Sequence, residues 1–159
     1  MRVRKLTPDD IETLRTIRIE SLRSDPDAFG STLAREEGRT DDDWRSWLGR
    51  GATFVAEDDE GPVGLVVVIA HDPPPAGIYA MFVSPRARRG GVGKALVEAA
   101  LAWSDAVGAP ETALLVVDGN TAAITLYESC GFAFTGRTEI RERDGVVERE
   151  MARVSRTRR

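Results

Sequence analysis

The chain has 159 residues, of which 42% are hydrophobic, so one domain of this size can bury a core without help from metals or disulfides. Its single cysteine, Cys130, excludes an internal disulfide and a multi-cysteine zinc site, and its single histidine, His71, argues against a histidine-rich metal site. The net charge of −4 argues against broad nucleic-acid binding, while the scarce cysteines and the lack of any apolar run approaching about 18 residues favour a cytoplasmic protein without a membrane span.

The chain begins with a predicted strand and a predicted helix. Residues 3–6 have the composition of a short strand. Thr7, Pro8 and Asp10 then form a helix-start pattern, because Thr7 can cap the helix, Pro8 suits its first position and Asp10 completes a capping box. A similar capping pattern at residues 40–43 predicts a second helix.

The middle of the chain reads as strands followed by a helix. Residues 53–57 and 63–70 are β-rich runs joined by a short acidic turn, which predicts a hairpin. Residues 78–83 predict a further strand, and Pro85 ends it because proline offers no N–H to a ladder. From residue 92 to residue 107, apolar side chains recur at helical spacing.

The last third of the chain predicts a strand, a helix and a hairpin. Residues 113–117 form an unbroken apolar run, as expected of a strand covered on both faces. Asn120 can cap a helix over residues 121–130, and Gly131 fits its left-handed stop. Residues 132–141 and 146–151 flank Asp144 and Gly145, a strong hairpin pattern.

No linker or internal repeat divides the chain, so we expect a single domain over residues 1–153. Residues 154–159 carry three arginines and few apolar side chains, which predicts a basic, frayed tail.

A glycine-rich segment, Arg88-Arg89-Gly90-Gly91-Val92-Gly93-Lys94, lies between a predicted strand and a predicted helix. Glycines let the backbone turn tightly and approach a ligand, and the first N–H groups of the following helix have no internal partner. Those N–H groups, the helix dipole and the positive side chains of the segment form a site suited to phosphate. The alternative is a structural turn with solvated arginines.

Spacing excludes two well-known phosphate loops. A P-loop needs a glycine where Arg88 stands and Ser or Thr where Ala95 follows Lys94. A dinucleotide-binding fingerprint needs a small residue where Leu96 stands.

Two motifs in the remaining pattern carry a family resemblance. Arg88-x-x-Gly91-x-Gly93 resembles the pyrophosphate-binding motif of the GCN5-related N-acetyltransferase (GNAT) family. Residues 120–132, which run from Asn120 through Leu-Tyr-Glu to Gly-Phe, resemble the second motif of that family, and the two lie in the family's order. The likeness covers about residues 53–151. It implies an α/β fold with a mixed, mostly antiparallel central sheet of six to seven strands flanked by about four helices.

The resemblance also implies roles for individual residues. Backbone groups of the strand before the loop would pair with the pantetheine arm of acetyl-CoA, the loop amides would hold its pyrophosphate, and Asn120 would lie near the pantetheine. The cofactor-binding set is therefore Met81, Phe82, Val83, Arg88, Arg89, Gly90, Gly91, Val92, Gly93, Lys94 and Asn120, with no metal.

Tyr127 is the predicted general acid, because a positioned hydroxyl can protonate the thiolate that leaves a thioester. The alternative for Tyr127 is a core aromatic side chain. Cys130 lacks a histidine nearby in the sequence, so we expect it to pack in the core rather than act as a nucleophile.

The general base is unassigned at this stage. Many family members carry a glutamate where Gly77 or Leu115 stands here, and neither residue can take a proton. The remaining candidates are Asp118, Glu36, Glu37, Tyr79 or a chain of waters.

The predicted function is transfer of an acetyl group from acetyl-CoA to a primary amine of a small molecule, by direct attack in a ternary complex. The alternatives are a protein N-terminal or lysine acetyltransferase and a non-catalytic CoA-binding module. No nucleic-acid or membrane partner is expected, and the sequence leaves a homodimer open.

Overall fold

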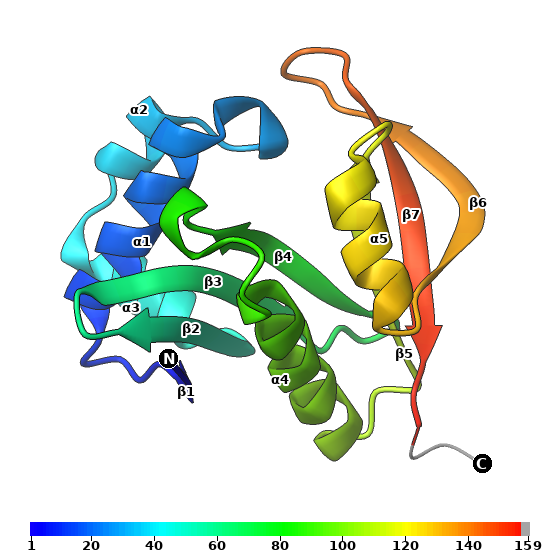
Figure 1. The fold of residues 1–159 in the computed structure, drawn as a ribbon, viewed down its shortest axis with the longest axis horizontal. Helices are drawn as coiled ribbons and strands as arrows, with labels where there is room; N and C mark the ends of the chain where they lie inside the picture. The colour runs from blue at the N-terminus through cyan, green and yellow to red at the C-terminus, as the bar shows by residue number, and fades with distance from the viewer. Residues whose placement is uncertain (157–159) are drawn as a thin grey trace.

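The computed structural model describes residues 1–156. In that part of the chain, seven strands form one sheet and five α-helices cover it (Figure 1). In chain order the elements are β1 (Arg2–Lys5), α1 (Ile11–Ser24), α2 (Leu33–Glu37), α3 (Asp41–Leu48), β2 (Ala52–Asp58), β3 (Gly61–Ile69), β4 (Ala76–Val83), α4 (Val92–Ala106), β5 (Glu111–Val117), α5 (Thr121–Ser129), β6 (Ala133–Ile140) and β7 (Val147–Val154). The expected mixed, mostly antiparallel sheet is confirmed.

The strand order is β1-β2-β3-β4-β5-β7-β6, and every neighbouring pair is antiparallel except β4 and β5. The parallel pair is short, since only Ala76 and Gly77 of β4 are in register with Thr112 and Ala113 of β5. Beyond that point the two strands separate. The remaining backbone groups on this side of β4 therefore have no strand partner among the described residues.

The half of the sheet before β5 buries side chains on both faces. On one face, α4 packs over β2 and β3, with Leu96 and Val66 fully buried. On the other, α1 and α3 cover Leu65 and Phe82. Gly64 fixes the first contact, because a Cβ there would lie 2.7 Å from Cδ1 of Leu96. The glycine thus lets α4 pack closely against β3.

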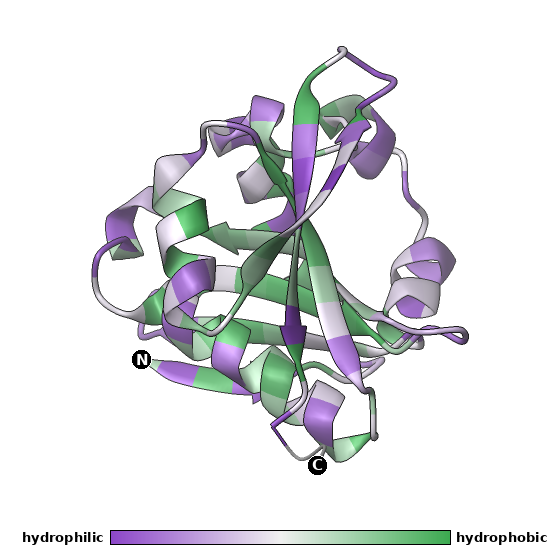
Figure 2. Ribbon diagram, turned by 90° about the vertical axis from the view of Figure 1, so that its right-hand side faces the viewer, coloured by the Kyte–Doolittle hydropathy of each residue, from purple (hydrophilic) through white to green (hydrophobic). Residues whose placement is uncertain are grey.

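The hydropathy pattern follows the same layering. The strands at the centre of Figure 2 are mostly hydrophobic, whereas the connection between β6 and β7 at the top is mostly hydrophilic. Within residues 1–156, no helix combines the length and the hydropathy that crossing a membrane requires.

Several predicted helix ends are confirmed. Thr40 and Asp43 form a complete capping box at the start of α3. The Asn120 side chain accepts a hydrogen bond from the Ala123 N–H at the start of α5, and Gly131 has a φ of 93° just after its end. The start predicted for the first helix is wrong. Thr7 donates its backbone N–H to Asp10 in a turn, and α1 begins only at Ile11.

Two expectations about the C-terminal half need correction or extension. The 113–117 strand is not covered on both faces, because the Leu115 side chain is 39% exposed. Strand β7 continues to Val154, inside the segment expected to be a frayed tail, and the next N–H, of Ser155, donates to the Pro110 carbonyl. Residues 157–159 of that segment lie outside the described residues.

Candidate active site

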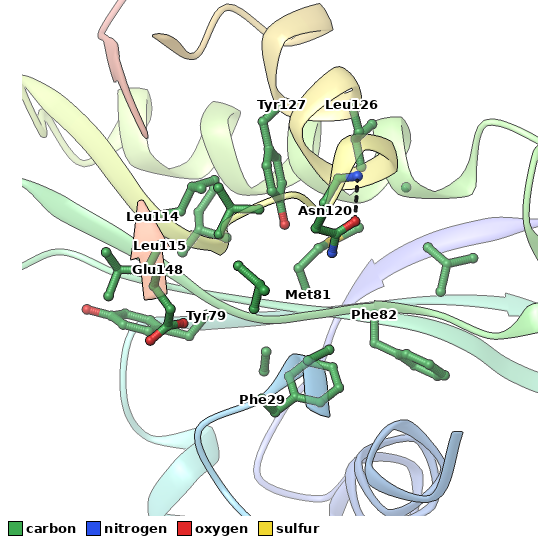
Figure 3. A pocket seen from close by; sticks show the side chains of 18 of the residues that line it. Phe29, Tyr79, Met81, Phe82, Leu114, Leu115, Asn120, Leu126, Tyr127 and Glu148 are labelled. Carbon is green, nitrogen blue, oxygen red and sulfur yellow. Dashed lines mark hydrogen bonds between the residues drawn. The ribbon is translucent and has the colours of Figure 1, made fainter. Parts of the chain in front are cut away.

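The separation of β4 from β5 opens into a cavity of about 1100 Å³. Its lining comes from β4, the loop before α4, α5, β5, β7 and the segment around Phe29 (Figure 3). These parts of the chain are far apart in sequence. The cavity therefore exists only because the sheet divides between two parallel strands.

At one end of the cavity, the glycine-rich segment turns into α4. Gly91 is the residue just before the helix and has a φ of 82°, in the left-handed region that glycine adopts without strain. Arg89 also has a positive φ, of 69°. The first N–H groups of α4 consequently open toward the cavity end, where Gly93 and Lys94 belong to the lining. This is the geometry expected of an anion site at a helix start.

The Arg88 side chain reaches neighbouring protein groups. Its Nε donates to the Val83 carbonyl at 3.0 Å, and its Nη2 pairs with Asp25 Oδ2 at 2.7 Å. Arg88 thus ties the glycine-rich segment to the end of β4 and to the residue that follows α1. The sequence did not reveal Asp25 as the partner of Arg88, because two residues 63 positions apart form no local pattern.

The free edge of β4 carries the residues expected to face a pantetheine arm. Met81, Phe82 and Val83 all line the cavity, although the Phe82 ring is buried on the opposite face against Phe29. Ala80 has a φ of 57°, and the β3–β4 register shifts between Leu65 and Val67. Such a bulge re-aims the strand that follows it. No local pattern in the sequence indicates this bulge.

Tyr127 and Asn120 approach the cavity from α5. The Tyr127 hydroxyl points into the cavity in Figure 3, and this side chain has no hydrogen bond within residues 1–156. Burial raises the pKa of Tyr127 well above its usual value, with a smaller contribution from Cys130. The hydroxyl therefore keeps its proton at neutral pH, as a general acid must. The Asn120 side chain caps α5 and also lines the cavity.

Tyr79 stands in the cavity on the side of β5. Its hydroxyl lies 2.7 Å from Nε2 of His71, and its ring folds back over Gly77. Burial raises the pKa of Tyr79. Of the four side chains considered as bases, Tyr79 is the one that lines the cavity.

The three candidate carboxylates lie elsewhere. Glu36 is 1% exposed and forms ion pairs with Arg18 and Arg39, so its carboxylate is committed to the packing of α1 and α2. Glu37 pairs with Arg23 on the surface. Asp118 is exposed, with Arg149 3.9 Å away. None of the three belongs to the cavity lining.

The structure brings in three carboxylates that sequence reasoning missed. Glu148 and Glu150 of β7 and Glu139 of β6 all line the cavity. The sequence offered only a weak indication of these carboxylates. Alternate residues of a strand lie on the same face. No local pattern, however, shows that this face of the hairpin lies across the cavity from β4. Burial raises the pKa of Glu148, and Arg141 opposes that effect.

Cys130 is buried in the core beside α4 and β7, as expected. Burial raises the pKa of its thiol, which keeps the thiol protonated.

Comparison with known proteins gives a consistent result. A model described as the acetyltransferase (GNAT) family matches residues 14–132. The chain is 35% identical over 136 residues to mycothiol acetyltransferase of Salinispora arenicola, covering 74% of this chain and 44% of that protein. It is 34% identical over 97 residues to the peptidyl-lysine N-acetyltransferase YjaB of Escherichia coli, covering 60% of this chain and 59% of that protein.

A solved structure has the same fold. The Salmonella typhimurium protein YncA, a putative acetyltransferase crystallised with its cofactor acetyl-CoA, superposes with a TM-score of 0.78 at 17% identity, over 97% of this chain and 93% of that one. The present chain spans less than half the length of the mycothiol acetyltransferase that it matches.

Proposed function

This chain belongs to the acetyltransferase (GNAT) family, and from that premise we propose that it transfers the acetyl group of acetyl-CoA to a primary amine. The observation that carries the proposal is the cavity between β4 and β5, because it joins an anion site to a proton donor. The start of α4 lies at one end of the cavity, and the Tyr127 hydroxyl points into its interior (Figure 3).

The donor half of the cavity fits acetyl-CoA. The N–H groups at the start of α4 would hold the pyrophosphate, with Lys94 and Arg89 adding positive charge nearby. The free edge of β4 at Met81 and Val83 would pair with the amide groups of the pantetheine arm, as an added strand would. Acetyl-CoA supplies the acetyl group as a thioester, so no further cofactor is required.

Tyr127 would act as the general acid. Its hydroxyl is protonated at neutral pH and has no protein hydrogen-bond partner in the described chain to compete for that proton. A leaving thiolate in the cavity would accept it. Orientation of the two reactants in one cavity would supply much of the remaining rate acceleration.

The acceptor would be the amine of a small molecule. The relative from Salinispora is named for mycothiol, a small molecule, and the acidic side chains at the β7 end of the cavity favour a cation. A lysine side chain of a protein is the second candidate acceptor, because one relative is named as a peptidyl-lysine N-acetyltransferase. With one cysteine and one histidine in the chain, we propose that the reaction needs no metal.

A panel experiment tests this function. Purified protein is mixed with acetyl-CoA and with small amines, lysine peptides or peptides with free N-termini, and released CoA thiol is measured with and without a chelator. We expect turnover with small amines, little with peptides and no effect of the chelator. Tight acetyl-CoA binding without turnover across the panel would instead indicate a CoA-binding module.

A further inference from the structure

Among the carboxylates of the cavity, Glu148 combines partial burial with the lack of a protein partner within residues 1–156. Asp25 pairs with Arg88, and Glu150 accepts a hydrogen bond from Thr135 Oγ1 at 2.8 Å. Glu148 forms no hydrogen bond or ion pair within residues 1–156, although its side chain is half-buried. Glu139 shares this lack of a partner but is exposed.

The position of Glu148 follows from the sheet. It lies on β7 in register with Val117, the last residue of β5, and with Glu139 of β6. In Figure 3 its carboxylate points into the cavity beside Tyr79. Leu115, 39% exposed, stands on β5 where the family resemblance leads one to expect a glutamate. Glu148 therefore brings a carboxylate to that region from the neighbouring strand.

The surroundings of Glu148 mix apolar and charged groups. Apolar surface comes from Phe29 and Leu115. The titratable groups that face it are Glu139 on β6, Tyr79 on β4 with its partner His71, and Arg141 and Asp144 at the turn between β6 and β7. Burial raises the pKa of Glu148, Glu139 and Asp144 raise it further, and Arg141 lowers it.

A half-buried carboxylate without a partner favours a cation that enters the cavity. Resting on the acetyltransferase function proposed above, we propose that Glu148 holds the acceptor as its ammonium ion and takes the proton that the amine must lose. The acceptor class that fits is a primary amine on an apolar carbon chain or ring, with the ammonium at Glu148 and the apolar part against Phe29 and Leu115.

The chemistry balances with the groups present. One proton of the ammonium ion moves to the Glu148 carboxylate, and the freed nitrogen lone pair forms a C–N bond to the thioester carbonyl carbon. The C–S bond breaks as the second amine proton leaves to water, and Tyr127 protonates the departing sulfur. Solvent at the open end of the cavity then reprotonates Tyr127 and deprotonates Glu148.

The test compares Glu148→Gln with Glu142→Gln. Glu142 lies on the same β6–β7 hairpin but is exposed and outside the cavity. Its substitution by glutamine therefore removes the same charge without changing the cavity, and it serves as the control. Acetylation of the best amine from the panel is followed from pH 6 to pH 10, together with acetyl-CoA affinity. We expect Glu148→Gln to lower kcat/KM about 100-fold at neutral pH, the lower range of general-base effects. The loss should shrink as the pH approaches the pKa of the amine, because more acceptor is then already deprotonated.

Acetyl-CoA affinity should stay within twofold of the unchanged protein, and Glu142→Gln should behave like the unchanged protein. If Glu148→Gln lowers affinity for acetyl-CoA or folds poorly, Glu148→Asp replaces it, and we expect an intermediate rate with the same pH dependence. An unchanged kcat/KM, or a loss that is constant with pH, would overturn the role of Glu148 alone. Failure of the unchanged protein to acetylate any amine would overturn the proposed function and this inference with it.

Discussion

The hydroxyl oxygen of Tyr79 lies 2.7 Å from Nε2 of His71, with the phenol ring folded back over Gly77. A Cβ at Gly77 would lie 2.3 Å from that hydroxyl. Tyr79 therefore fills the space in which a side chain at position 77 would stand, and a larger residue there would have to displace the ring. This packing accounts structurally for the absence of a carboxylate at position 77.

Gly77→Ala should displace the Tyr79 ring and break its contact with His71. Both residues line the cavity, on the side that we propose for the acceptor. We therefore expect a higher KM for the amine with little change in acetyl-CoA affinity. Steady-state kinetics with each substrate varied in turn measures both effects. Tyr79→Phe, which keeps the ring, serves as the comparison. An amine KM unchanged by Gly77→Ala would show that the Tyr79 position does not matter to the acceptor.

Tyr127→Phe should lower kcat about 100-fold, because the proposed general acid is lost while the ring that packs against Phe132 remains. Stability and acetyl-CoA affinity should change little, since the hydroxyl has no hydrogen bond to lose within the described chain. Rapid-mixing kinetics measures turnover, urea unfolding measures stability, and an acetyl-CoA binding titration measures affinity. An equal loss of turnover and cofactor affinity would instead indicate a structural role.

Gly91→Ala should destabilise the turn before α4. With φ at 82°, an alanine would be strained, and we expect the free energy of unfolding to fall by about 1 kcal/mol. Acetyl-CoA affinity should fall as well, because the backbone at the helix start must shift. Gly49→Ala is the control, since Gly49 ends α3 with a φ of −83° and tolerates a side chain. Equal stabilities of the two variants would contradict the strain argument.

The ion pair between Arg88 and Asp25 should couple the glycine-rich segment to the end of α1. A double-mutant cycle with Arg88→Ala and Asp25→Ala should give a coupling energy of about 0.2–1 kcal/mol, the range of partly exposed pairs. Urea unfolding of the four proteins measures it. The coupling should shrink in 1 M salt, where the screening length is about 3 Å. Purely additive effects at low salt would show that the pair contributes nothing.

Stability should fall in acid through the buried carboxylate of Glu36. Burial alone would raise its pKa, but Arg39 and Arg18 outweigh that effect and lower it. A carboxyl group whose folded pKa is lowered contributes stability above its unfolded pKa of about 4.3, and that stability is lost as the pH falls through the folded value. The urea concentration at the midpoint of unfolding, measured from pH 7 to pH 3, should therefore fall as the pH is lowered.

Glu36→Gln provides the matched variant for that measurement. It should cost about 3–5 kcal/mol at pH 7, because Arg18 would remain buried without its charge partner. It should also flatten the acid dependence. A variant as stable as the unchanged protein would show that the ion pairs merely offset the cost of burying their charges.

Local patterns in the sequence were sufficient for most of the elements. The capping box at Thr40, the cap at Asn120 and the stop at Gly131 depend on neighbouring residues, and each was predicted correctly. The start of α1 was not, because the Asp10 carboxylate is also held by Arg4 of β1. That contact keeps residues 7–10 in a turn. Tertiary pairing thus overrode a valid local pattern.

The sequence by itself determined the half of the cavity that we propose for the acetyl donor. A strand, a glycine-rich turn and a helix start are consecutive in the chain, so their geometry is fixed by short-range backbone rules that spacing reveals. Only the tertiary structure decided the half that we propose for the acceptor. Where β4 separates from β5, one cavity is lined by residues from four separate segments of the chain: Phe29, His71, Tyr79 and Glu148. Their proximity depends on strand order and register, which no local pattern encodes.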